Sequence, residues 1–419
     1  MTKIKLSTKR LTPGLYIKLD CPWNSHPFLS GSFQIQNQLQ IDALQSLTIK
    51  YVFFFPEKSN ATPLPPNFNQ EEDKNDNDSE IDKIKALWSE KTQRIEEQKR
   101  YSRNLKKYKN YCEQSLSVVR AIHLKMANQG QQALTDATEL IVSINEILDS
   151  NKSIILQLME KGEKGDEYYN HVFHVTILSL ILGKSLALSA PQLIQLGLGA
   201  LFHDLGLSKI PSKIVNNNPK ITQAEKNYLK LHVRYAIAMI NDIPNIPVAV
   251  TEIVSQHHEY LDGSGYPQRL KGKEINFLSQ IVSVADEFDT LCNPADKYVN
   301  RPPYQALAYL YKNRSEQLNK KVIGLLIKEL GVYPPGSVVL LSNEKYALVI
   351  NPAEGNILQP DVLIYDPSIP KNEAPIISLS KEKLKIEKVI LATKLPEKIQ
   401  EYLNLNSSVS YYFENNGGG

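Results

Sequence analysis

Hydrophobic and polar positions follow a helical period through the middle of the chain. Between residues 151 and 330, apolar side chains recur every three or four positions, and few segments show the signals of a strand. One apolar face is formed by Ile281, Val284, Ala285, Phe288 and Leu291. The pattern predicts a mainly α central domain.

Both ends of the chain show strand patterns instead. Residues 51–55 are β-branched or aromatic, and the run stops at Pro56. After Gly331, short β-branched runs such as Val338–Leu341 are separated by turns. We therefore expect a β-rich sensory domain over residues 1–62 and a small β extension over residues 333–419, on either side of the helical domain.

Residues 63–110 connect the first domain to the helical one and change composition along their length. Residues 71–82 hold seven carboxylates and one lysine, which predicts a solvated linker. Residues 91–109 then hold eight Lys and Arg and two acids. From Tyr101 to Val119, apolar positions recur at steps of three and four. This stripe predicts either a signalling or dimerising helix or a nucleic-acid arm, or an amphipathic helix packed on its own chain, and the last is favoured.

Composition excludes several classes of protein. Of 419 residues, 42% are hydrophobic and 22% charged, so global disorder is excluded. A net charge of +3 gives no general reason to expect a nucleic-acid partner. The three cysteines lie far apart, which is typical of reduced thiols. No secretory signal opens the chain, and the most apolar stretch, residues 172–188, contains His174 and Lys184. We expect a cytoplasmic protein with no membrane span.

Six of the eight histidines lie between residues 171 and 258, together with several well-placed carboxylates. The potential ligands are Glu167, His171, His203, Asp204, His232, His257, His258 and Asp286. Imidazole and carboxylate donors without thiolates suit Fe, Mn, Zn or Ni, and their number exceeds what one ion needs. Two or three metal ions bridged by a carboxylate such as Asp204 would favour hydrolysis of phosphate esters.

Other polar residues near this set receive weaker interpretations. His174, on an apolar helix face, is expected to be a buried core residue. Asp289 is either a partner of a metal ligand or an acid on the helix surface. His26 and His123 lie outside the set and receive no role.

One longer motif identifies a family. Residues 257–267, with the sequence HHEYLDGSGYP, match the HHExxDGxGYP signature of the HD-GYP family. The pair His203-Asp204 is similar to the HD doublet of that family, and the order of the other candidate ligands also resembles it. The resemblance covers residues 111–332. The opening segment, around residues 11–14 and 20–23, resembles an uncharacterised N-terminal domain often fused to HD-GYP proteins.

The resemblance implies a helical, metal-dependent phosphodiesterase of the HD superfamily that opens cyclic di-GMP to pGpG, and in some members continues to GMP. All eight potential ligands would hold two or three divalent ions, most often Fe or Mn, with Glu167 at the position associated with a third. Asp204 would also orient the attacking hydroxide, and His232 is a second candidate for a catalytic role, as proton donor. Tyr266 would pack against a guanine, and Arg301 would pair with a phosphate.

The chain departs from the family pattern at two cations. A basic residue that is often found soon after the position of Arg301 is Gln305 here. Many members read HDxGK, whereas this chain has Leu207 at the lysine position and Lys209 two residues later as a candidate phosphate ligand. One alternative is therefore a degenerate sensor that binds metal and cyclic dinucleotide and acts through a protein partner, such as a diguanylate cyclase. Another is a phosphodiesterase for a different cyclic dinucleotide. A homodimer is expected if the helical stripe is intermolecular.

Overall fold

The computed structural model describes residues 2–47, 49–66, 77–157, 167–216, 222–293, 301–352 and 356–405. Of the predicted acidic linker, residues 71–82, the first half, residues 71–76, lies outside the described residues. Residues 77–82 are not a linker, because helix α2 (Asn77–Lys125) begins there. The chain forms two compact units. The first comprises residues 1–103 and 363–376, and the second comprises residues 104–362 and 377–419. The predicted division at residues 62, 110 and 332 stays a prediction.

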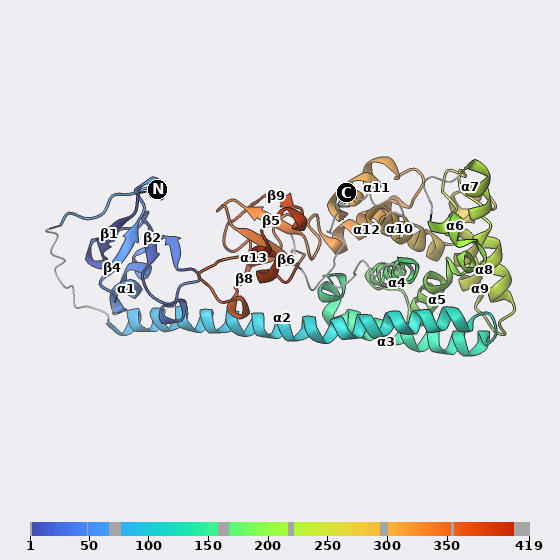
Figure 1. Ribbon diagram of the computed structural model, residues 1–419, viewed down its shortest axis with the longest axis horizontal. Coiled ribbons are helices and arrows are strands. Elements are labelled where there is room, and N and C mark those ends of the chain that lie inside the picture. The colour runs from blue at the N-terminus through green and yellow to red at the C-terminus, as the bar shows by residue number, and fades with distance from the viewer. Residues whose placement is uncertain are drawn as a thin grey trace. The chain divides into compact units, whose positions relative to one another are not determined.

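The first unit contains a four-stranded antiparallel sheet with strand order β1-β4-β2-β3 (Figure 1). Its strands are β1 (Ile4–Ser7), β2 (Tyr16–Leu19), β3 (Ser32–Gln34) and β4 (Tyr51–Phe54). Helix α1 (Gln38–Ser46) begins where the Asn37 side chain accepts a hydrogen bond from the backbone of Gln40. Buried Ile17, Ile41 and Leu44 form part of one core between helix and sheet. The predicted β-rich start of the chain is confirmed.

Helices build nearly all of the region that carries the candidate ligands. They are α2 (Asn77–Lys125), α3 (Gly130–Gln157), α4 (Glu167–Ser185), α5 (Ala190–Phe202), α6 (Ser212–Asn216), α7 (Gln223–Leu229), α8 (His232–Asn241), α9 (Val248–Gln256), α10 (Phe277–Cys292), α11 (Pro303–Asn313) and α12 (Lys320–Leu330). Between α5 and α6 lies the short 3-10 helix η4 (Leu205–Lys209). The mainly α fold class is confirmed.

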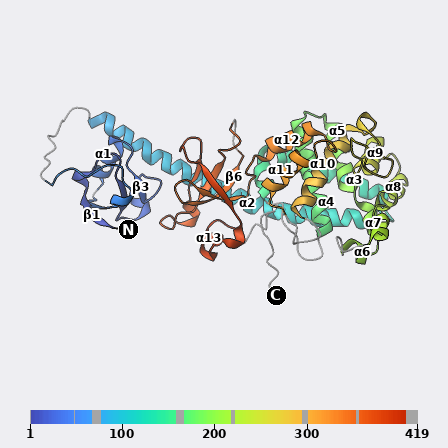
Figure 2. The same cartoon turned by 90° about the horizontal axis from the view of Figure 1, so that it is seen from above.

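Helix α4 lies at the centre of this bundle and packs against α5, α10 and α12 (Figures 1 and 2). Every residue from Val172 to Gly183 is buried, which explains why the segment carries so few polar side chains. The expectation that it is a core helix is therefore confirmed. Within the described residues, no helix combines the length and the apolar character that crossing a membrane requires.

The apolar stripe of α2 faces the protein itself. Tyr108, Cys112 and Val119 are buried, and the Tyr111 hydroxyl lies 2.9 Å from Oγ of Ser143 on α3. Lys125 at the end of α2 forms a 2.6 Å ion pair with Asp136 of α3. The interpretation that the helix packs on its own chain therefore accounts for the stripe.

A second sheet follows the helices, as the β-branched runs predict. Its strands are β5 (Val338–Leu341), β6 (Tyr346–Asn351), β7 (Asp361–Ile364), β8 (Ile376–Ser378) and β9 (Ile386–Ile390), in the order β8-β7-β6-β5-β9. Helix α13 (Glu397–Tyr402) follows β9.

Candidate metal centre

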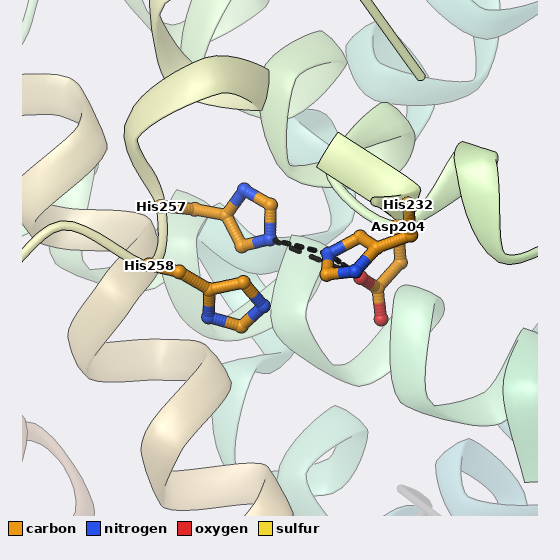
Figure 3. A group of neighbouring side chains, drawn as sticks. All are labelled: Asp204, His232, His257 and His258. Carbon is orange, nitrogen blue, oxygen red and sulfur yellow. Dashed lines mark hydrogen bonds and ion pairs between the residues drawn. The ribbon is translucent and has the colours of Figure 1, made fainter. Parts of the chain in front are cut away.

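Five segments of the helical bundle bring the candidate ligands together. His171 comes from α4, His203 and Asp204 follow α5, His232 opens α8, His257 and His258 follow α9, and Asp286 comes from α10. They form two groups, one of Asp204, His232, His257 and His258 and one of His171, His203 and Asp286. Within each group, one ligand atom per residue lies within 4.8 Å of the others. Figure 3 shows the side chains of the first group pointing toward one another.

The Asp204 carboxylate lies between the two groups. Its Oδ1 is 3.2 Å from Nε2 of His232 and 3.8 Å from Nε2 of His257. Its Oδ2 is 3.5 Å from Nε2 of His203 and 3.7 Å from Nε2 of His171. Each oxygen thus faces a different set of imidazoles, which is the arrangement of a bridging carboxylate.

Asp286 spans the groups in a similar way. Its Oδ1 lies 3.2 Å from Nε2 of His171, and its Oδ2 lies 3.7 Å from Nδ1 of His258. Because Asp286 is on α10 and Asp204 follows α5, the two carboxylates approach the imidazoles from different elements.

Hydrogen bonds fix which nitrogen faces the centre in four of the five rings. Nδ1 of three rings donates to the carbonyl three residues earlier, at 2.7 Å from His203 to Ala200, 2.8 Å from His232 to Leu229 and 2.9 Å from His257 to Val254. Nδ1 of His171 is 2.7 Å from Oδ2 of Asp289. With Nδ1 engaged in this way, the Nε2 lone pairs point inward, as metal-binding imidazoles do.

The inward nitrogens fit bound cations. Nε2 of His203 lies 3.3 Å from Nε2 of His171, and Nε2 of His232 lies 3.5 Å from Nε2 of His257. In the His232 and His257 pair, both rings carry their proton on Nδ1, so two acceptors lie face to face in a buried site. In the other pair, the carboxylates of Asp286 and Asp289 outweigh burial and raise the pKa of His171, whose Nε2 faces Asp286. A cation between the two acceptors removes their repulsion, and the imidazole and carboxylate donors suit Fe, Mn or Zn.

Electrostatics keep most of the donors in the form that binds metal. Burial alone would raise the pKa of Asp204, but the imidazoles of His203 and His232 outweigh it and hold the pKa below its usual value. Burial is also opposed at Asp286, where the hydrogen bond from His171 lowers the pKa. Burial lowers the pKa of His258 to about 4. At neutral pH these carboxylates are ionised and His258 is neutral.

Asp289 supports a ligand from behind. Its buried carboxylate accepts from Nδ1 of His171 at 2.7 Å and lies 3.0 Å from Nδ1 of His174. The structure therefore excludes an acid on the helix surface and makes Asp289 the partner of His171, a candidate ligand. His174 is 2% exposed on α4, so its interpretation as a core residue is confirmed.

Glu259 anchors the Gly-rich turn beside the cluster, a role that the sequence pattern alone did not predict. Its buried carboxylate accepts from the backbone N–H groups of Gln268, Arg269 and Leu270 at 2.5, 3.0 and 3.0 Å. The turn holds the Tyr266 ring 4.7 Å from the ring of His258. The aromatic side chain expected to meet the substrate thus lies at the edge of the centre.

His123 lies behind the HD doublet, although it received no role from the sequence. From α2, its Nε2 is 2.9 Å from the Leu201 carbonyl, and its Nδ1 is 2.9 Å from the Tyr168 hydroxyl. That hydroxyl also lies 3.1 Å from the carbonyl of Asp204. Nothing in the spacing of these residues along the chain signals the contact, because three separate helices create it.

Besides Tyr266, three predicted site residues are not part of either group. Glu167 is the first residue of α4 and is exposed. Lys209 ends η4 and is also exposed. The Arg301 guanidinium lies 4.5 Å from the centroid of the Tyr309 ring. Their assignment to metal or substrate stays a prediction.

Two family models match the chain. The HD domain model matches residues 142–322, and a model described as a domain of unknown function (DUF3391) matches residues 3–137. The second match supports the resemblance of the opening segment to a domain fused to HD-GYP proteins.

Three curated relatives were compared with the chain. It is 24% identical over 375 residues to the cyclic di-GMP phosphodiesterase PA4108 of Pseudomonas aeruginosa, covering 86% of this chain and 84% of the relative. It is 29% identical over 203 residues to the cyclic di-GMP phosphodiesterase response regulator RpfG of Xanthomonas campestris, covering 47% of this chain and 53% of the relative. It is 27% identical over 164 residues to the 3'3'-cGAMP-specific phosphodiesterase 3 of Vibrio cholerae, covering 39% of this chain and 35% of the relative. The match thus spans about half of RpfG and about a third of the Vibrio protein. Residues 142–322 thus match an HD domain, and with the HHEYLDGSGYP turn beside a cluster built on the HD doublet these matches support the expected place of the chain in the HD-GYP family.

Proposed function

We propose that this protein is a metal-dependent phosphodiesterase that hydrolyses cyclic di-GMP to pGpG, and further to GMP, in bacterial second-messenger signalling. The observation that carries the proposal is the Asp204 carboxylate, whose two oxygens face two separate groups of donors. Its support from similarity is the cyclic di-GMP phosphodiesterase PA4108, which the alignment covers over 84% of its length.

The two donor groups support a centre of two divalent ions, with Fe or Mn as the expected metals. When bound, such a pair lowers the pKa of a coordinated water and stabilises charge on phosphoryl oxygens. In this chain, Asp204, Asp286 and the imidazoles of both groups would hold the two ions. Glu167 would serve a third ion if its exposed carboxylate turned toward His171, which lies one helical turn later.

His232 fits the role of ligand better than that of proton donor. Its Nδ1 proton is engaged by the Leu229 carbonyl, and its Nε2 faces Asp204 at 3.2 Å. A ring held in this way has no free N–H to offer a leaving oxygen. Tyr266 is proposed to pack against a guanine, and Arg301 and Lys209 are proposed as phosphate ligands.

Two alternatives rest on specific observations. The cGAMP-specific relative supports a different cyclic dinucleotide as substrate, because it shares 27% identity over 164 residues. Leu207 in place of the HDxGK lysine supports the degenerate sensor, whereas the full set of donors favours turnover. We also propose a protein partner, such as a diguanylate cyclase, and a homodimer. A cytoplasmic location is proposed as well, which the wide separation of the three cysteines along the chain supports.

The test is turnover of cyclic di-GMP by the purified chain after loading with Mn²⁺ or Fe²⁺, with products separated by chromatography. Asp204→Ala should abolish turnover and lower the metal content, because one substitution removes a donor from both groups. Circular dichroism should show that the helical fold persists. Asp242→Ala, at an exposed acid after α8, is the matched control and should change neither. Full metal content in Asp204→Ala would contradict the assignment.

A further inference from the structure

A lysine that no family motif predicted lies beside the aromatic ring of the Gly-rich turn. Lys230 connects α7 to α8, two residues before His232, and is exposed. Its Nζ is 4.8 Å from the centroid of the Tyr266 ring. Because that ring is 4.7 Å from the His258 ring, the ammonium group lies at the edge of the metal centre.

The charge of Lys230 is not neutralised by any carboxylate in the described part of the chain. Among the described residues, no carboxylate forms an ion pair with it, and its contact is with the face of an aromatic ring. A ring face holds an ammonium group only weakly at an exposed site. A phosphate oxygen is a stronger partner, because the hydrogen bond then joins two opposite charges. An anion that reaches the centre therefore draws Lys230 away from Tyr266.

Leu207, at the position of the missing family lysine, and Lys230 each lie within two residues of one close backbone contact. Gly206 lies so near α8 that a Cβ built on it would overlap the His232 carbonyl oxygen. Leu207 follows Gly206, and Lys230 precedes His232 by two residues. The two positions thus flank one close contact between η4 and α8. Leu207 is half-buried and carries no charge, whereas Lys230 is exposed and cationic.

From these contacts we infer that Lys230 binds a phosphate of the cyclic dinucleotide and supplies the cation that Leu207 does not. The inference rests on the proposed function, since it names a ligand for the substrate of that same centre. The two lysine side chains have different surroundings. Lys209 is exposed at the end of η4, whereas Lys230 lies against the ring of Tyr266.

The experiment compares metal-loaded full-length proteins by KM and kcat for cyclic di-GMP and by elemental analysis. Lys230→Ala should raise KM about tenfold to a hundredfold at unchanged metal content, since one charge-assisted hydrogen bond is lost. Lys230→Arg should keep KM within about threefold, because it keeps the charge. Lys226→Ala is the matched control, an exposed lysine one helical turn earlier, and should leave KM unchanged.

A second variant tests the link to position 207. Leu207→Lys should recover most of the affinity lost in Lys230→Ala. A KM within twofold of the unaltered protein in Lys230→Ala would overturn the inference, and so would a loss of the same size in Lys226→Ala. Titration calorimetry of cyclic di-GMP separates this from failure of the proposed function. If the unaltered chain binds the dinucleotide without cleaving it, the hydrolase fails, and the dissociation constants of the variants decide on Lys230. Absence of binding would overturn both.

Discussion

At the scale of single residues, the centre depends on groups that never need to touch a metal. The buried Asp289 carboxylate joins His171 and His174, and it places negative charge beside a ligand ring. Burial would raise its pKa, but His174 and His171 outweigh that effect and hold the pKa below its usual value. Asp289 is therefore charged at neutral pH, orients His171 and makes its Nε2 a better donor.

Asp289→Asn should weaken metal binding about tenfold to a hundredfold, because the amide keeps the shape of the carboxylate but loses its charge. The measurement is competition with a chelator of known affinity. Glu274→Gln makes the same chemical change at an exposed acid and should leave the affinity unaltered. Equal affinities in the two variants would assign Asp289 to packing alone.

The sequence predicts the ligands better than it predicts their supports. His257 and His258 stand in a long motif, so the order of residue types along the chain is enough to predict their chemistry. Asp289 is three residues from Asp286, which places both on one helix face but leaves its partner open. His123 gives no such hint, because its contacts with Leu201 and Tyr168 join three helices that are far apart in the chain.

At the scale of elements, the approach of η4 to α8 sets where Asp204 and His232 stand. The backbone of Gly206 occupies space that no side chain could share, since a Cβ there would overlap the His232 carbonyl oxygen. Because that carbonyl belongs to backbone, it cannot rotate aside as a side chain could. The glycine of the HD motif is therefore a requirement of packing between two elements.

Gly206→Ala should destabilise the fold and lower activity, since η4 or α8 must move and the Asp204 to His232 distance of 3.2 Å must change. Gly324→Ala is the contrasting variant, because a Cβ on that glycine within α12 meets nothing within 4 Å. It should stabilise the protein by about 0.5–1 kcal/mol through helix propensity. Thermal unfolding and turnover measure both. Unchanged thermal stability and turnover in Gly206→Ala would show that η4 can shift away from α8 without cost.

Helix α2 shows what a periodic pattern leaves open. Apolar steps of three and four residues describe a seam between two chains as well as a face against the same chain. Tyr108, Cys112 and Val119 are buried within one chain, and Tyr111 contacts Ser143 of α3, so these positions of the helix are covered by the same chain. Such contacts depend on α3 lying alongside, which no local pattern in α2 could express.

At the scale of the whole molecule, the chain separates into two compact units, and both groups of donors lie in the second. The first unit has its own buried charge. Lys91 is 4% exposed, and its Nζ donates to the carbonyls of Trp23 and His26, the latter at 2.6 Å. The same nitrogen lies 3.7 Å from the Trp23 ring centroid. Burial lowers the pKa of Lys91 from 10.5 to about 8, against the opposing charge of Glu373.

The stability of the first unit should therefore depend on pH in a defined window. Below pH 8 both folded and unfolded forms carry the Lys91 proton, so the cost of burying the charge is present in full. Between pH 8 and 10.5 the folded form has released a proton that the unfolded form still holds. Stability contributed by this group then rises with pH. Lys91→Met has no such proton, so its free energy of unfolding should lack this rise.

Tryptophan fluorescence can follow this unit alone, because both tryptophans of the chain, Trp23 and Trp88, belong to it. Urea unfolding at several pH values should give curves for Lys91→Met and the unaltered protein that diverge between about pH 8 and 10.5. If the free energies of unfolding of the two proteins changed with pH in the same way, the lowered pKa of Lys91 would be contradicted. Metal content should stay the same in Lys91→Met, since every donor of the two groups lies between His171 and Asp286 in the other unit. A loss of metal in that variant would show that the two units are energetically coupled.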